Sequence, residues 1–426
     1  MPIPQPGRSR RLRVLVVTPA FPFPPACGID MRNYQLMREV AARFEVTLLS
    51  YTTPEDDPGL AELRTGLSIQ TVLRKQTTQL GRRLSQLRSL TTTQPFANRM
   101  LHSDAMQAAI NDLCTAADFD LIHVESNAMC NFAFPDGVPI VLDEHNVEYE
   151  LHRRLYQGER SRLRRWFSFL EYVRVRRFEE RCWAQVHGCV VTSAREEPTV
   201  QATAPSTPTA VVPNGVDLEY FAPWAGNVQP KSVVFNGILN YRPNLDAAVH
   251  LVDDVWPLVL KRCPSARLVL VGSAPKRLVQ RLAQPTVEVL GRVPDIRPYL
   301  GSAHVIAVPV RMGGGTRLKV VEALSMAKPM VSTSLGCEGL AVRDREHLLI
   351  ADDAEGFAGR ILELFEDAAL GQRLGMAGRA LAENAYSWHL AGDRLAELYQ
   401  RVVNGQPDLH RPFARTEPIY ALPARA

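Results

Sequence analysis

Three consecutive glycines in the second half of the chain suggest a site for an anion. They lie within PVRMGGGTRLKVVEALS (residues 309–325), after a short apolar run and before a helical pattern that Thr316 can cap. Free backbone N–H groups at such a junction, together with the positive end of the helix dipole, favour phosphate. The segment therefore predicts either a plain tight turn or a phosphate-binding loop made by Gly313, Gly314 and Gly315.

Charged residues after the glycines narrow the choice of ligand. Arg317 and Lys319 fall in the first turn of the expected helix, where they would strengthen the binding of an anion. Glu322 follows one turn later, where a carboxylate would repel phosphate and instead accept hydrogen bonds from sugar hydroxyls. These residues fit a diphosphate joined to a sugar. The alternative is a solvated basic helix end.

The composition indicates a cytoplasmic globular protein of two domains. The chain has 426 residues, 46% of them hydrophobic, and a net charge of +4. Its seven cysteines include no CxxC pair, which argues against structural zinc and a disulfide framework and favours a reducing compartment. No apolar run approaches the ~18 residues of a spanning helix. Asp118 and Asp120 fit a helix end and turn, so we expect no metal site.

Short β-branched runs alternate with helical patterns in both halves, which predicts parallel sheets covered by helices on both faces. In the first half we expect strands near 12–18, 45–51, 67–73, 120–125, 138–143, 187–192 and 209–212. In the second half we expect them near 232–236, 266–271, 286–290, 304–308 and 329–333. We expect helices near 29–43, 103–116, 147–185, 244–261, 275–283, 295–301, 315–327, 355–368 and 370–384. The fold class is therefore α/β.

The domain boundary is expected at the turn signal Asn214-Gly215. We assign residues 10–208 to a first doubly wound domain and 209–386 to a second. The final helix, 387–403, is expected to pack back on the first domain, and residues 404–426 to form a poorly ordered tail. Ligands of parallel sheets bind beyond the carboxyl ends of the strands, which predicts a site in a cleft between the domains.

Four segments together resemble the GT-B fold glycosyltransferases, most closely the retaining transferases of family four. They are VVPNGVDLEYFAP (211–223), FNGILNYRPNLDAA (235–248), VEVLGRVPDIRPYLGSAHVIAVPV (287–310) and the stretch from GGGTRLK to GCEGL (313–340). The resemblance extends from Leu12 to about Arg401. It implies two Rossmann-like domains facing an interdomain cleft, with the nucleotide-sugar donor on the second and the acceptor on the first.

The resemblance also assigns donor-side residues. Glu322 aligns with the second glutamate of the family's E-x7-E motif, while Gly314 stands where the first would be. Gly237 aligns with a glycine that the family follows with a phosphate-binding arginine. This chain has Ile238 there, so phosphate binding is expected to pass to Arg317 and Lys319. The remaining donor contacts that we expect are Arg242 and the main chain at Arg292 and Val293.

On the acceptor side, the resemblance implies that His145 points toward the reacting sugar, since it follows the strand VPIVLD. We count His145, Glu322, Arg317 and Lys319 as catalytic. Gly28 matches a loop that approaches phosphate or acceptor. Glu144 and Asn146 are candidates for the same side, although acids beside His145 could equally orient it or begin the next helix.

Membership of the family implies sugar transfer from a nucleotide sugar to a glycan or lipid-linked acceptor with retention, in cell-surface or exopolysaccharide synthesis. The scheme requires no cofactor and no metal. Two alternatives stay open. Nucleotide-sugar 2-epimerases share the architecture, and the missing glutamate and arginine could mark a protein that binds a nucleotide sugar without turning it over.

Two basic stretches lie in the expected acceptor domain. Residues 63–103 carry six arginines, Lys75 and no acid, and residues 151–181 carry ten arginines and four glutamates with aromatic residues between them. Such stretches suit an anionic membrane surface or a lipid-diphosphate acceptor. A solvated helical face rich in ion pairs is the alternative. No nucleic-acid motif accompanies the charge, so we expect no nucleic-acid partner.

Overall fold

The computed structural model describes residues 10–25, 27–53, 67–74, 94–159, 161–314 and 317–405. The chain forms two compact units. The first comprises the residues up to Val212 and those from Gly392 onward, and the second comprises Pro213–Ala391. Each unit is built on its own parallel sheet, so the expected α/β class is confirmed.

Among the described residues, the first unit contains a seven-stranded sheet in which neighbouring strands all run parallel. The central strands are continuous apolar runs, and their side chains are buried because helices cover both faces. Across the sheet the strands are β3 (Ser68–Leu73), β2 (Glu45–Thr52), β1 (Arg13–Thr18), β4 (Leu121–Glu125), β5 (Ile140–Glu144), β6 (Gly188–Val191) and β7 (Thr209–Val211).

The last strand of this sheet, β7, belongs to the first unit, so the boundary between the units lies after it. Residues 209–212 were expected to begin the second domain, but β7 pairs with β6 in parallel, with Cys189 opposite Thr209. The first unit therefore continues to Val212 before the chain enters the second. The turn signal at Asn214-Gly215 lies just beyond this point, in the second unit.

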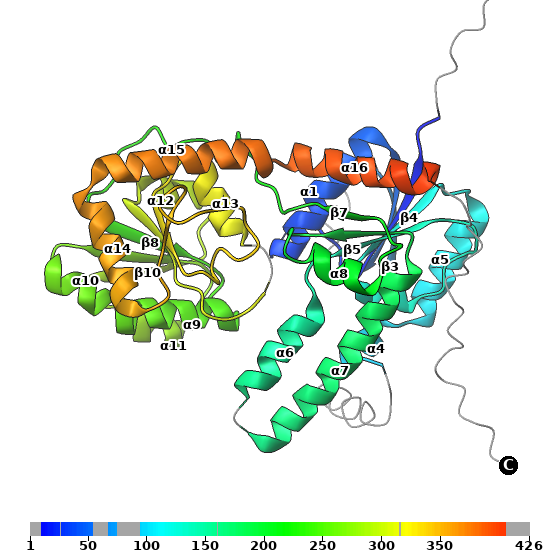
Figure 1. Cartoon of the computed structure of the whole chain (residues 1–426), viewed down its shortest axis with the longest axis horizontal. Coiled ribbons are helices and arrows are strands. Elements are labelled where there is room, and N and C mark those ends of the chain that lie inside the picture. The colour runs from blue at the N-terminus through cyan, green and yellow to red at the C-terminus, as the bar shows by residue number, and fades with distance from the viewer. Residues whose placement is uncertain are drawn as a thin grey trace, which may run out of the picture. The chain divides into compact units, whose positions relative to one another are not determined.

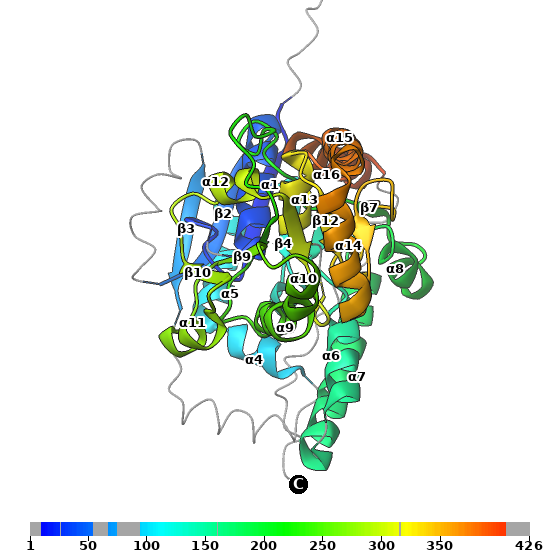
Figure 2. The same ribbon diagram turned by 90° about the vertical axis from the view of Figure 1, so that its left-hand side faces the viewer.

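The helices of the first unit include a long hairpin. Helices α6 and α7 run side by side and extend away from the sheet (Figures 1 and 2). The helical segments are α1 (Gly28–Arg43), α4 (Phe96–Leu101), α5 (Asp104–Ala116), the 3-10 turn η2 (Asn127–Asn131), α6 (Glu148–Gly158), α7 (Arg162–Gln185), α8 (Glu197–Thr203) and α16 (Trp388–Asn404). In the described part of the chain, no helix is both long and apolar enough to cross a bilayer.

Helix α16 contributes to the core of the first unit from Gly392 onward. Its Tyr399 is fully buried and its ring lies 5.6 Å from that of Phe44. Arg43 forms an ion pair with Asp393 at 2.6 Å. A Cβ at Gly392 would lie 2.5 Å from Cβ of Glu39, so the helix approaches α1 closely where it carries no side chain.

The second unit repeats this topology. Its six described strands lie in the order β10-β9-β8-β11-β12-β13, and all pair in parallel. In both sheets the chain adds strands first on one side of the first strand and then on its other side, so the strand order reverses there, as in Rossmann-like domains. The strands are β8 (Ser232–Asn236), β9 (Arg267–Val271), β10 (Val287–Gly291), β11 (Val305–Val308), β12 (Met330–Ser332) and β13 (Leu349–Ile350).

Helices lie on both sides of the second sheet, with α9 and α11 on one side and α13 and α15 on the other (Figures 1 and 2). The helices are α9 (Arg242–His250), the π-turn η3 (Leu251–Val255), α10 (Trp256–Arg262), α11 (Lys276–Leu282), α12 (Arg297–Ser302), α13 (Leu318–Ser325), α14 (Ala354–Glu366) and α15 (Ala368–Ala385).

Two expected helices are interrupted. The stretch 147–185 is two helices, α6 and α7, because the chain leaves helical geometry around Glu159, whose backbone is extended. The stretch 244–261 contains η3, whose wider turn precedes Pro257, a residue without a backbone N–H for the helical ladder. Hydrophobic spacing persists through both breaks, so it did not reveal them.

Candidate functional site

The second unit gathers its candidate residues where its strand order reverses. Strand β8 lies between β9 and β11, and the chain leaves these strands at Asn236 and Val308. Open parallel sheets bind ligands beyond the carboxyl ends of strands at such a reversal. The glycine segment and the residues after β8 both follow these strand ends directly.

Lys319 of α13 reaches the end of β8. Its ammonium donates to the carbonyl of Asn236 at 2.5 Å and to Oδ1 of Asn244 at 3.1 Å. It also lies 4.6 Å from the ring centroid of Phe235. A Cβ at Gly237 would lie 2.8 Å from Nζ, so the absence of a side chain there leaves room for the lysine. A lysine has three N–H donors, and these two bonds leave one for a ligand.

Lys319 and Glu322 form a partly buried pair one turn apart on α13. Burial lowers the pKa of Lys319 to about 7, with a further contribution from Arg317 and an opposing one from Glu322. Burial raises the pKa of Glu322 to about 7, against the charge of Lys319. Within the described ranges, no protein donor forms a hydrogen bond with the Glu322 carboxylate. Both groups are thus held near the point of ionisation with hydrogen-bonding capacity to spare.

The glycine loop differs from the expectation in its helix start. Helix α13 begins at Leu318, and Arg317 occupies the N-cap position with an extended backbone (φ −86°, ψ 94°) instead of lying in the first turn. Its guanidinium donates to the carbonyl of Gly314 at 2.8 Å, which ties the arginine back to the loop. Gly313 has φ +100°, a conformation that favours glycine. Gly315 and Thr316 lie outside the described residues.

Three adjacent strands of this sheet end on glycine. Gly237 follows β8, Gly272 follows β9 and Gly291 ends β10. A Cβ at Gly272, where φ is +146°, would lie 1.9 Å from the Gly237 carbonyl oxygen. No atom lies within 4 Å of the Cβ position of Gly291. The carboxyl edge is therefore lined by bare backbone that a ligand can approach closely.

The other expected donor residues lie around this edge. Arg292 follows Gly291 and is exposed, whereas the neighbouring Val293 packs against the core of the unit. Arg242 is the first residue of α9 and is exposed. Lys319 and Glu322 are supported as site residues by their contacts and by their shifted pKa values. Arg242 and Arg292 are supported only by their location near the carboxyl edge of the sheet.

In the first unit, His145 belongs to a buried chain of hydrogen bonds. Its Nε2 lies 2.7 Å from one carboxylate oxygen of Glu125, and the other oxygen lies 3.0 Å from Nε2 of His123. Nδ1 of His123 in turn lies 2.7 Å from the hydroxyl of Tyr399 on α16. All four side chains are buried. This series of hydrogen bonds connects the carboxyl ends of β4 and β5 to helix α16.

The hydrogen bonds and charges of this buried network shift the pKa values of His145 and Glu125. Burial lowers the pKa of His145, but the hydrogen bond to Glu125 and the charge of Asp143 outweigh it, so the pKa is raised. Burial alone would raise the pKa of Glu125, yet His123 and His145 hold it well below its usual range. Glu125 therefore stays ionised, and its charge favours the imidazolium form of His145.

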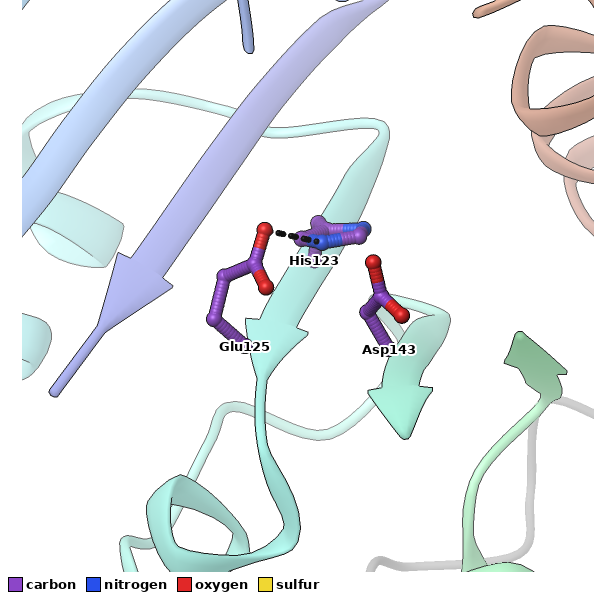
Figure 3. Close-up of side chains that lie close together, drawn as sticks. All are labelled: His123, Glu125 and Asp143. Carbon is purple, nitrogen blue, oxygen red and sulfur yellow. Dashed lines mark hydrogen bonds and ion pairs between the residues drawn. The ribbon is translucent and has the colours of Figure 1, made fainter. Parts of the chain in front are cut away.

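Three side chains of this region lie close enough to resemble a metal site, namely His123, Glu125 and Asp143 (Figure 3). Asp143 accepts two hydrogen bonds from Arg32, from Nε at 3.1 Å and from Nη2 at 2.9 Å. The ring nitrogens of His123 and the oxygens of Glu125 are engaged as described above. The charge of Asp143 is compensated by Arg32. The contacts of these three side chains are therefore explained by hydrogen bonds and ion pairs within the protein.

The remaining acceptor-side candidates separate in space. Successive residues of a strand face opposite sides, so Glu144 points away from the side of Asp143. It accepts hydrogen bonds from Asn127 at 3.1 Å and from the Trp183 indole at 3.0 Å, inside the unit. Oδ1 of Asn146 is buried without a partner among the described residues. Gly28 is exposed at the first turn of α1. Glu144 is therefore not brought together with His145.

Sequence reasoning missed the residues that hold His145. Glu125 lies 20 positions before it, Arg32 lies 111 positions before Asp143, and Tyr399 lies 276 positions after His123. The alternation LIHVE in β4 offers one signal, because it places His123 and Glu125 on the same face of a buried strand. Two polar side chains on such a face need partners, although the spacing does not say which.

Two Rossmann-like units, with a lysine and a carboxylate at the strand reversal of the second, define a protein of the GT-B class. Comparison with known proteins agrees. Residues 26–220 match the family described as Glycosyltransferase Family 4, and residues 230–367 match that described as Glycosyl transferases group 1. The two matches together take in most of the chain, and both families are glycosyltransferases.

Several of the curated relatives are mannosyltransferases whose names state a substrate. A GDP-mannose-dependent monoacylated alpha-(1-6)-phosphatidylinositol monomannoside mannosyltransferase from Corynebacterium glutamicum is 26% identical over 44% of this chain. That match spans 55% of the relative, about half its length. A phosphatidyl-myo-inositol mannosyltransferase from Mycobacterium leprae is 26% identical over 72% of this chain and 79% of its own.

Solved structures confirm the fold. Sucrose-phosphate synthase from Thermosynechococcus elongatus superposes with a TM-score of 0.67 at 20% identity, over 93% of this chain and 100% of that one. HepE from Anabaena, solved in complex with UDP, gives a TM-score of 0.64 at 15% identity, over 91% and 99% of the two chains.

Proposed function

We propose that this protein transfers a sugar, with retention, from a nucleotide-sugar donor to a glycan or lipid-linked acceptor in cell-surface polysaccharide or glycolipid synthesis. The observation that carries the proposal is Lys319, a partly buried lysine with a spare N–H beside Glu322, whose carboxylate accepts no hydrogen bond from the described residues. A cation and a carboxylate held one turn apart suit a ligand that is anionic at one end and rich in hydroxyls at the other.

On this proposal, Lys319 binds the diphosphate and Glu322 binds hydroxyls of the donor. As the bond from the anomeric carbon to the diphosphate oxygen breaks, negative charge grows on the leaving phosphate. A preorganised ammonium stabilises that charge more than it stabilises the ground state. The acceptor hydroxyl attacks the anomeric carbon, and its proton passes to the departing phosphate. Arg317 is the second cation of this loop.

The first unit supplies the acceptor side in this proposal. His145, whose pKa is raised by the hydrogen bond to Glu125 and by the charge of Asp143, is suited to hold a hydroxyl of the transferred sugar. The relatives named above act on phosphatidylinositol-based acceptors, so an acceptor with an anionic lipid headgroup is the class we favour. Such an acceptor would bring the protein to the cytoplasmic face of a membrane.

The test is release of nucleoside diphosphate by the purified protein. UDP-, GDP- and ADP-sugars are supplied in turn with a lipid-linked acceptor extract, and both nucleotide and glycolipid product are measured. We expect release with one donor, and its loss in Lys319→Ala and Glu322→Ala. Lys261→Ala and Glu366→Ala, which alter exposed residues elsewhere in the second unit, serve as controls.

Two results would refute the proposal. Epimerised donor without release of nucleotide would make the protein an isomerase. Tight binding of a nucleotide sugar with no turnover across the acceptor panel would make it a binding partner. Retention is checked separately, from the anomeric configuration of the product by NMR.

A further inference from the structure

The α6–α7 hairpin ends in a tip that is both apolar and basic. We define the tip as residues 153–159 and 161–169. Leu163 is 77% exposed and Trp166 is 54% exposed on α7, with Phe169 at 44% on the same helix and Leu155 at 47% on α6. Soluble surfaces rarely gather side chains of this size without a partner.

The ring contacts that hold the hairpin together do not include Leu163 or Trp166, whereas the ring of Phe169 lies 5.6 Å from that of Tyr156 and so belongs to the seam. The seam between the helices is filled by a ladder of rings in which Tyr156 lies 5.5 Å from Tyr172, and Tyr149 lies 6.3 Å from Tyr172 and 6.1 Å from Trp183. At the base, Glu179 accepts hydrogen bonds from the backbone N–H groups of Glu148 and Tyr149, both at 2.7 Å, and so caps α6.

A third contact fixes the hairpin from the side. Glu171 accepts a hydrogen bond from the backbone N–H of Phe96 at 3.1 Å and forms an ion pair with Arg174 at 2.7 Å. The hairpin is therefore held at its base and along its seam. Leu163 and Trp166 lie at the start of α7, before Tyr172 of the ring ladder and at the opposite end of the helix from Glu179. The ends of α6 and α7 that meet there project away from the sheet (Figure 1).

The charge of the tip indicates the kind of partner. Glu159 is its one acid, and a carboxylate oxygen of that residue accepts from the backbone of Ser161 at 3.0 Å. Against it stand five arginines: Arg153, Arg154, Arg162, Arg164 and Arg165. A tip that combines a large excess of cations with an exposed tryptophan and leucine is complementary to an anionic surface with an apolar layer beneath it.

We propose that this tip docks on the surface of an anionic lipid bilayer. Trp166 and Leu163 would enter the boundary between headgroups and acyl chains, and the arginines would pair with lipid phosphates. The proposal deepens the proposed function, on which it rests only for the idea that the acceptor is a lipid. The hairpin would then hold the first unit at the surface where such an acceptor lies.

Other occupants of the tip fit less well. Residues 75–93 of this chain, which lie outside the described residues, carry Lys75, Arg82, Arg83 and Arg88 and no acid, so their charge has the same sign. A second copy of the hairpin would also bring like charges together. Nucleic acid would match the charge but offers no apolar layer for Leu163.

Vesicle binding by the full chain tests the proposal without donor or acceptor. Flotation is measured with vesicles of phosphatidylcholine alone and with 30% phosphatidylglycerol. We expect binding to the anionic vesicles only, weakened severalfold by raising the salt from about 0.05 to 0.5 M. We expect at least tenfold weaker partition for Leu163→Ala/Trp166→Ala and for Arg162→Gln/Arg164→Gln/Arg165→Gln.

Matched controls come from the second unit. Met376→Ala removes a side chain that is 64% exposed on α15, and Arg262→Gln/Arg277→Gln/Arg281→Gln removes three exposed arginines. We expect both to bind vesicles like the unaltered protein. Tryptophan fluorescence adds a local readout, because quenching by brominated lipid should disappear in Trp166→Phe. Circular dichroism checks that each variant is folded.

Three outcomes would overturn the proposal. The first is equal binding to neutral and anionic vesicles. The second is vesicle binding that survives both tip variants. The third is tip-dependent binding of RNA, or tip-dependent dimerisation, in protein that does not bind vesicles. Because these measurements need no turnover, an inactive protein that binds vesicles through the tip would refute the proposed function and leave this inference standing.

Discussion

Replacing Lys319 with methionine tests whether this lysine is placed for a ligand or for the fold. Its pKa is about 7 in the folded protein against 10.5 for an ordinary lysine. At pH 6 the group is charged in both folded and unfolded chains, so the folded state bears the full cost of about 5 kcal/mol, at about 1.4 kcal/mol per pKa unit. Methionine keeps most of the stem and removes that cost.

The loss of contacts offsets part of the gain. Methionine cannot donate to Asn236 or Asn244, and two hydrogen bonds contribute about 2 kcal/mol. We therefore expect Lys319→Met to raise the free energy of unfolding by about 3 kcal/mol at pH 6. Between pH 7 and 9 the unfolded lysine holds a proton that the folded one lacks, so the unaltered protein becomes more stable by about 1.4 kcal/mol per unit. Near pH 9 the advantage of methionine should vanish.

Ligand binding should change in the opposite direction. Loss of a charge-assisted hydrogen bond to phosphate corresponds to about 1.5–3 kcal/mol, or roughly 10- to 150-fold in the dissociation constant of the nucleoside diphosphate. Urea denaturation at pH 6 and 9 gives the stability, and calorimetric titration gives the affinity. Lys261→Met is the control, since that lysine is exposed. A variant that is less stable at pH 6 and binds nucleotide normally would show that Lys319 is structural.

Three further predictions follow from contacts elsewhere. Glu125→Gln should lower the pKa of His145, measured by NMR titration of its ring proton, because the partner that favours the imidazolium loses its charge; an unchanged pKa would refute the hydrogen-bonded chain. Glu179→Ala should destabilise the first unit by about 1–3 kcal/mol in urea, since two N–H groups of α6 lose their acceptor, and unchanged stability would contradict the capping role. Gly272→Ala should cost at least about 2 kcal/mol, because its Cβ would overlap the carbonyl of Gly237; a normal melting temperature would show that β9 can shift.

The sequence predicted the sheets well because each strand is a short apolar run bounded by polar residues. Strand 232–236 was located to the residue, and most others to within one or two. The short pair Leu349–Ile350 was missed, since two residues carry no periodic signal. Helices were harder to delimit. The spacing of 147–185 stays helical across Glu159, so only the backbone reveals the break between α6 and α7.

The candidate site was predictable where function depends on neighbours in the chain. Gly313, Lys319 and Glu322 lie within ten residues of one another, and a loop before a helix brings such residues together by local geometry alone. The contacts of Lys319 with Asn236 and Asn244 were not predictable in this way. They depend on how closely α13 packs against the end of β8. The sequence of neither segment alone specifies that packing.

The buried charges of this protein fall into two groups, and the difference separates structure from function. Asp143 receives both of its contacts from Arg32, and Glu179 receives its contacts from Asn127 and two backbone N–H groups. Their carboxylates are satisfied by the fold. Glu322 accepts no hydrogen bond from a protein donor among the described residues, and Lys319 keeps one N–H beyond its two bonds. Burying these charged groups costs free energy that the fold does not fully compensate, and a bound ligand can offset that cost. Selection for stability alone would favour apolar residues at these two positions.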